Sequence, residues 1–195
     1  MLACTQAGAI EEAEYRVIRA EKPFEVREYA PQIIAEVTVD GPFDEAADQA
    51  FSLLFAYISG ANVKRGEIAM TAPVSQTAEG EKIAMTAPVE QREAGERWSV
   101  SFLMPAAYTL DTLPRPTDSR VTIRSVPARR MAAIRYSGTW SERRYREHHA
   151  ALQSWMAERG LRAGGEAIWA RYNPPFTPWF LRRNEILVPL PSTDP

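Results

Sequence analysis

The chain has 195 residues, of which 45% are hydrophobic and 10% aromatic, a composition that can bury the core of one domain or two small ones. The 23 Lys and Arg residues against 25 Asp and Glu residues give a formal net charge of −2, so no basic surface is expected to bind nucleic acid. One Cys excludes an internal disulfide, and two His with it cannot form a structural zinc site. The sequence contains no run of 18 apolar residues, so it predicts no transmembrane segment.

Both ends of the chain are predicted to lie outside the folded domain. Residues 1–14 are expected to form a flexible N-terminal segment, and residues 191–195 a tail. Met1 to Cys4 resembles the end of a bacterial lipoprotein signal, whose Cys carries lipid, while the alternative is an incidental Cys. The compartment is therefore left open between the cytoplasm and an exported lipoprotein anchored at Cys4.

Strands that succeed one another before a helix favour an antiparallel sheet and an α+β fold. The first helix is predicted from spaced apolar residues, with Asp44 as its N-cap and Ser59-Gly60 as its end. The second is predicted over residues 141–159 and ends before Gly160. Strands are predicted where apolar and polar residues alternate or β-branched residues gather, over residues 15–19, 24–29, 33–39, 98–104, 121–126, 131–136, 168–172 and 185–188.

A long internal repeat sets the expected organisation of the domain. Sliding the chain by 97 residues places Ala35 on Ala132 and Gly41 on Gly138, so that the order strand, strand, Gly, helix occurs twice. We therefore expect one domain over residues 15–190, with pseudo-repeat halves of about 15–104 and 105–190. The alternative is two unrelated strand-strand-helix units.

A short repeat is identical in sequence. Residues 68–74, Ile-Ala-Met-Thr-Ala-Pro-Val, recur as residues 83–89, which favours two strands of a hairpin. The Pro in each copy cannot donate to a strand ladder and belongs at a strand end, an edge or a bulge. A second interpretation, compatible with the first, is that the Met side chains line an apolar cavity.

The sequence contains no convincing catalytic or metal-binding pattern, so no catalytic or metal-ligating residues are predicted. The G-x-S-x-G and H-E-x-x-H motifs are absent, and Gly164-Gly165 fits a turn. His148 and His149 lie on the second predicted helix, where locally hydrogen-bonded boundary histidines are favoured over metal or haem ligands.

Apolar residues gather in two places that could form a groove. The segment 172–180 holds four aromatic residues and three prolines. Phe51 and Phe55 lie one helical turn apart and could face that segment, forming the wall of a groove for a flat apolar ligand. The alternative is packing of both rings in the core.

Four kinds of segment together resemble the SOUL family of haem-binding proteins, over about residues 15–188. They are Phe-Glu-Val-Arg-Glu-Tyr-Ala-Pro at 24–31, the two copies of the short repeat, Tyr-Asn-Pro-Pro at 172–175 and Arg-Arg-Asn-Glu-Ile at 182–186. The resemblance implies a distorted antiparallel barrel with two amphipathic helices, built from a duplicated half. It also implies a monomeric or weakly associating protein that binds haem or another tetrapyrrole without covalent attachment.

The resemblance also implies a set of site residues on the first helix and the Pro-rich loop, namely Asp48, Phe51, Ser52, Phe55, Tyr172, Phe176 and Thr177. Some relatives bind the haem iron through a His where this chain has Glu28, so no axial His is expected here. Other relatives place basic residues beside the propionates, where this chain has Asp48, Ala56 and Thr177. An Asp there repels a propionate. Substitute positive charge could come from Lys64, Arg65, Arg171, Arg182 or Arg183.

The sequence therefore predicts a protein that binds haem or a related tetrapyrrole in an apolar groove. One alternative is another small hydrophobic ligand, as in the related effector-binding domains. A second is a domain that binds other proteins through the aromatic loop. A third is a hydrolase, as reported for some relatives, in which Glu28 and Tyr172 form an acid-base pair.

Overall fold

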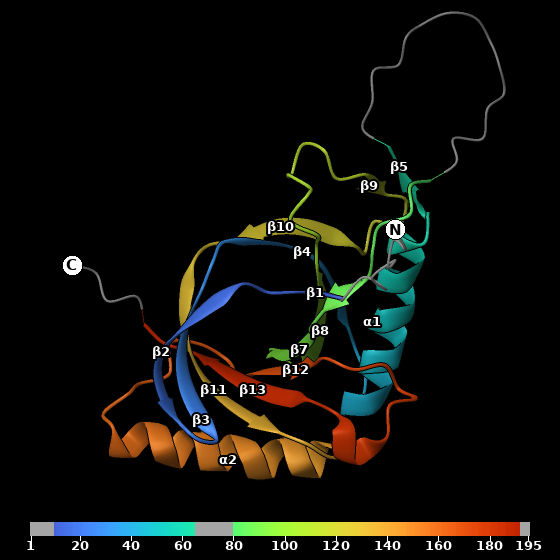
Figure 1. Cartoon of the computed structure of the whole chain (residues 1–195). Helices are drawn as coiled ribbons and strands as arrows, with labels where there is room; N and C mark the ends of the chain where they lie inside the picture. The colour runs from blue at the N-terminus through green and yellow to red at the C-terminus, as the bar shows by residue number, and fades with distance from the viewer. Residues whose placement is uncertain (1–9, 65–79, 192–195) are drawn as a thin grey trace, which may run out of the picture.

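The computed structural model describes residues 10–64 and 80–191. Cys4, Arg65 and the first copy of the short repeat lie outside these ranges. The fold is α+β, as predicted: a nine-stranded antiparallel sheet curls into a half-barrel, and both helices lie on its outer face (Figure 1). Within the described residues, neither helix is long and apolar enough to cross a membrane.

The main sheet has the order β10-β4-β8-β7-β12-β13-β11-β3-β2. Two short pairs, β1 with β6 and β5 with β9, accompany it. The strands are β1 (Glu11–Glu12), β2 (Tyr15–Glu21), β3 (Phe24–Tyr29), β4 (Gln32–Val39), β5 (Asn62–Val63), β6 (Thr86–Ala87), β7 (Val89–Ala94), β8 (Arg97–Leu103), β9 (Arg115–Pro116), β10 (Thr122–Val126), β11 (Arg129–Tyr136), β12 (Ile168–Arg171) and β13 (Asn184–Pro189). The helices are α1 (Phe43–Ile58), α2 (Glu142–Glu158) and the short 3₁₀ turn η1 (Trp179–Leu181).

The order of elements follows the long repeat. The series β3, β4, α1, β7, β8 is matched by β10, β11, α2, β12, β13, and β4 shifted by 97 residues coincides with β11. In the sheet, β10-β4-β8-β7 is followed by the mirrored series β12-β13-β11-β3, so each half pairs its first strand with the other half. This is the arrangement that a duplicated strand-strand-helix unit predicts.

Helix α1 packs against β4 and β8 because its small and branched residues fall on one side. Ala46, Ala50 and Leu54 are fully buried against Val37 and Val100. The predicted N-cap at Asp44 is wrong, since Pro42 occupies the cap and the helix begins at Phe43. The backbone of Pro42 is extended, with φ of −61° and ψ of 157°, as is usual at an N-cap, and its side chain forms no capping hydrogen bond.

Helix α2 covers β11 and β13 through Leu152, Trp155 and Met156, which are buried beside Ile134 and Ile186. Its predicted start is confirmed, because the Ser141 hydroxyl accepts a hydrogen bond from the backbone N–H of Arg144 at 3.4 Å. The two helices therefore cover opposite halves of one sheet.

The second copy of the short repeat contains β6 and the first residue of β7. Pro88 separates β6 from β7, as expected of a residue that cannot donate to a ladder. In the described part of the chain, β6 pairs in parallel with β1. The predicted hairpin with residues 68–74 lies outside the described residues. The strands β1, β5, β7 and β9 were not predicted from the sequence, whereas β6 lies within the strand predicted over residues 83–89.

Candidate functional site

A cavity of about 300 Å³ lies between the first helix, the second copy of the short repeat and the loop that follows β12. Helix α1 supplies Ala47, Asp48, Phe51 and Phe55, and the repeat supplies Met85, Thr86, Ala87 and Val89. Residues 171–175 form the facing wall, with Trp140 and Ile10 beside them. Most of these side chains are apolar, which is typical of a small-ligand pocket.

The helix wall consists of two parallel rings. The centroids of Phe51 and Phe55 lie 5.9 Å apart with 10° between the ring planes. Phe51 also contacts Phe102 of β8 in an edge-to-face arrangement, with 5.3 Å between centroids, so it joins the cavity to the core. Phe55 is 50% exposed, which an apolar ring in the core would not be.

The cavity contains four of the seven residues predicted for the site: Asp48, Phe51, Phe55 and Tyr172. The other three lie outside its lining. The Ser52 hydroxyl donates to the carbonyl of Asp48 at 3.0 Å on the exposed side of α1. Phe176 is 85% exposed, and the carbonyl of Thr177 accepts a hydrogen bond from Arg182.

Trp140 and Ile10 of the lining were not among the predicted site residues, and Arg171 was predicted only as one of several sources of charge. The guanidinium of Arg171 lies 5.4 Å from the ring centroid of Trp140 and 4.9 Å from that of Trp169. Arg171 is the basic residue and Asp48 the acidic one among the described residues of the lining. Met85 lines the cavity, as the second interpretation of the short repeat predicts.

The other proposed sources of charge are engaged elsewhere. Arg182 donates to the carbonyls of Pro175 and Thr177, at 2.6 and 2.8 Å. Arg183 pairs with Glu12 and with Glu185, while Lys64 lies 4.0 Å from Glu81. Arg171, which donates to Gln91 at 3.4 Å, is the cation among the described residues that line the cavity.

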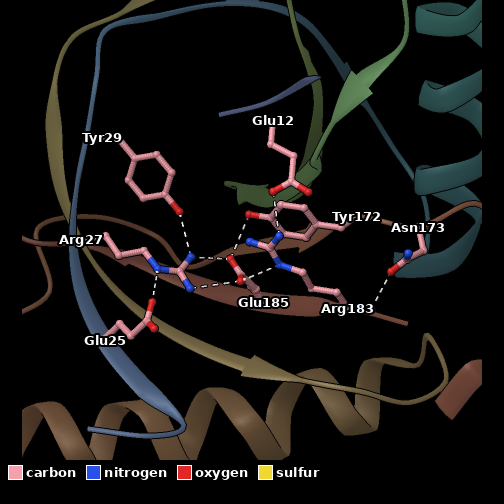
Figure 2. Close-up of polar contacts among 8 residues, drawn as sticks. All are labelled: Glu12, Glu25, Arg27, Tyr29, Tyr172, Asn173, Arg183 and Glu185. Atoms are coloured by element: carbon pink, nitrogen blue, oxygen red, sulfur yellow. Dashed lines mark hydrogen bonds and ion pairs between the residues drawn. The ribbon is translucent and has the colours of Figure 1, made fainter. Parts of the chain in front are cut away.

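Tyr172 joins the cavity to a buried charge network on the inner face of the sheet (Figure 2). Its hydroxyl donates to Glu185 at 2.9 Å, and Glu185 also accepts from Arg27 and Arg183. Burial raises the pKa of Tyr172 well above its ordinary value, and the carboxylate of Glu185 raises it further. Tyr172 is therefore a neutral phenol whose proton points toward Glu185.

Glu185 is charged although no part of it is exposed. Burial raises its pKa, but the hydrogen bonds and charges of Arg27 and Arg183 outweigh burial and hold the pKa below its ordinary value. The network also positions the cavity wall, because the backbone N–H of Arg183 donates to the Asn173 side chain at 2.6 Å (Figure 2).

The acid-base pair of Glu28 and Tyr172 does not form. Glu28 pairs with Arg16 at 2.5 Å, across the strands β2 and β3, and does not line the cavity. The carboxylate that meets Tyr172 is Glu185, whose two Arg partners oppose its protonation.

The two histidines lie away from the cavity. His148 stacks on Tyr136 with 3.9 Å between ring centroids, and His149 on Tyr145 at 5.7 Å. Burial lowers the pKa of both imidazoles. The described residues also hold no group of three or more potential metal ligands.

A curled antiparallel sheet with two outer helices, and an apolar cavity against the first of them, defines a duplicated α+β domain with a pocket at the edge of its half-barrel. Residues 10–189 match the model of the family described as SOUL heme-binding protein, and the chain belongs to that family.

Curated relatives agree with this assignment, and two solved structures share the fold. The chain is 29% identical to Heme-binding protein 1 of Xenopus tropicalis over 187 residues, covering 92% of both chains. It is 27% identical to Heme-binding protein 2 of Homo sapiens, covering 83% of this chain and 79% of that one. The EcmrR C-terminal domain superposes with a TM-score of 0.60 at 10% identity, covering 91% of this chain and 98% of that one. A hydrolase from Listeria innocua gives a TM-score of 0.55 at 13% identity, with coverages of 89% and 94%. At these identities the two structures show a shared fold alone.

Proposed function

We propose that this protein binds haem or a related tetrapyrrole in the cavity beside α1, through apolar contacts and without a histidine ligand to iron. The observation that carries the proposal is the parallel pair of Phe51 and Phe55, whose outer ring stays half exposed in an apolar cavity. Membership of the SOUL family supports the same ligand class.

The lining fits the ring of a tetrapyrrole better than it fits the iron. Apolar side chains on both walls can cover a flat ring, while no histidine is present among the described residues of the lining. A volume of about 300 Å³ is at the lower end for ligand pockets. The cavity would therefore enclose only one face and one edge of a tetrapyrrole ring, and the remainder of the ring would extend over Phe55.

The polar groups of the cavity orient such a ligand. Arg171 can pair with a propionate, whereas Asp48 on the opposite wall repels one. The ring would then lie with its carboxylates toward residues 171–175. Tyr172 offers iron no phenolate, because Glu185 and burial keep its phenol protonated. Haem would supply an iron centre whose reactivity depends on its axial ligands.

A second candidate is another small hydrophobic ligand. The observation that favours it is Asp48, an exposed carboxylate in the lining that suits an apolar ligand carrying positive charge. The predicted monomeric state and the protein-binding alternative stay predictions.

Titration of the purified protein with hemin tests the proposal. We expect a saturable shift of the Soret band and at least about tenfold weaker binding in Phe55→Asp, because a charge at the ring face must be desolvated. Leu110→Asp is the matched control, since Leu110 is 41% exposed and lies outside the cavity lining. A folded protein that gives no shift, or equal binding by Phe55→Asp and wild type, would contradict the proposal.

A further inference from the structure

The loop between β12 and β13 exposes a cluster of large apolar side chains. Phe176 is 85% exposed, Leu181 65%, and Trp179 and Phe180 each 57%. We call these four residues the apolar tip. The loop lies beside the first turn of α1 and extends outward from the sheet (Figure 1). We propose that the apolar tip docks the protein on a lipid bilayer that contains anionic lipid.

The composition of the apolar tip suits a membrane interface. Trp and Phe prefer the interface between lipid headgroups and acyl chains. The rings of Trp179 and Phe180 meet edge to face, with 5.6 Å between centroids, and both remain open to solvent. A soluble protein rarely leaves such a cluster uncovered.

Five backbone carbonyls of the loop accept hydrogen bonds from within the loop. Pro174, Pro175 and Pro178 have no N–H to satisfy. The carbonyls of Pro175 and Thr177 accept from the Arg182 guanidinium, and those of Pro174, Pro178 and Trp179 accept from backbone N–H groups.

This hydrogen bonding favours lipid over a protein as the partner. A protein partner can complete hydrogen bonds that a loop leaves open, whereas lipid chains cannot. The five paired carbonyls lose little when the loop leaves water.

The charge of the loop favours anionic lipid. Between Arg171 and Arg183 the sequence has no Asp or Glu. In the described part of the chain, Arg182 forms no ion pair with a carboxylate, so its positive charge is not neutralised at the base of the tip. Basic residues beside an inserted apolar segment strengthen binding to anionic lipid. The proposal does not depend on what the cavity binds.

Cosedimentation with vesicles tests the proposal. We expect the full chain to bind vesicles of phosphatidylcholine and phosphatidylglycerol, and to bind pure phosphatidylcholine less. Combining Phe176→Ser, Trp179→Ser and Phe180→Ser should lower the bound fraction at least about tenfold. All three side chains are exposed, so circular dichroism should show an unchanged fold. The control combines Val63→Ser and Leu110→Ser, which remove exposed apolar side chains elsewhere.

Brominated lipids distinguish insertion from binding by charge alone. They should quench the emission of wild type, and Trp179→Phe should keep vesicle binding but lose much of the quenching. Absence of vesicle binding, or equal loss in the control and the triple variant, would overturn the proposal. Self-association without vesicle binding, abolished by the triple variant, would also overturn it and assign the tip to protein contacts.

Discussion

The guanidinium of Arg27 and the carboxylate of Glu185 form a two-pronged ion pair inside the half-barrel, at 2.5 and 3.1 Å. They lie on β3 and β13, on either side of β11, and 158 residues separate them in sequence. Along β11, Ala133 falls midway between their register partners, and its small side chain leaves room for the pair.

Breaking this ion pair should destabilise the fold strongly. Arg27→Met leaves the carboxylate of Glu185 buried with less compensation, and we expect a loss of about 3–5 kcal/mol in the free energy of unfolding. Combining Arg27→Met with Glu185→Leu should cost less than the sum of the two single changes. Urea unfolding of the four proteins measures this coupling, and additive losses would contradict it.

A second ion cluster makes stability depend on acid pH. Burial raises the pKa of Glu36, but hydrogen bonds from Arg124, Ser99 and Arg92 outweigh burial and lower the pKa from 4.5 to about 2. A pKa lowered by folding stabilises the fold above the unfolded value and loses that effect as pH falls through the folded value. Between pH 4.5 and about 2 wild type should therefore lose up to roughly 3 kcal/mol that Glu36→Gln, already less stable, does not lose. Parallel acid dependence of both proteins would count against this assignment.

The charges of the cavity should act on the propionates of hemin. Asp48→Asn should tighten hemin binding by about two- to fivefold, since Asp48 is exposed and its repulsion is screened. Arg171→Gln should weaken binding by about tenfold or less. Hemin dimethyl ester, whose propionates carry no charge, is the control, and both variants should bind it as wild type does. An equal effect on the ester would show that the substitutions act through the shape of the cavity.

Neither histidine should bind iron. His148→Ala and His149→Ala should leave the Soret spectrum of the hemin complex unchanged, because both imidazoles pack on tyrosine rings outside the cavity. A shifted band in either variant would require a rearranged site. Unchanged circular dichroism is needed alongside, since both rings are part of the packing of α2.

The sequence was sufficient to predict the strands in which apolar and polar residues alternate, and to predict both helices. The spacing of apolar residues predicted α1 and α2. The 97-residue offset predicted that β4 and β11 occupy equivalent places in the two halves. Phe51 and Phe55 could be linked to a groove because residues four positions apart lie on the same face of a helix.

The inner face of the sheet could not be predicted in the same way. Glu25, Arg27 and Tyr29 alternate with Phe24, Val26 and Glu28, a pattern that is also typical of a strand with one solvated face. Only the curl of the sheet buries Arg27 and brings Glu185 to it. The position of Arg171 in the cavity could not be predicted either, since its contacts with Trp140 and Trp169 join distant segments of the chain.

The most direct test of the account compares metal-free protoporphyrin IX with hemin in fluorescence-quenching titrations of wild type and Phe55→Asp. If apolar contacts with Phe51 and Phe55 hold the ring, both ligands should saturate wild type with dissociation constants within about tenfold of each other, and both should bind Phe55→Asp more weakly. Tight binding of hemin with no binding of protoporphyrin IX would contradict the account, because affinity would then come from the iron.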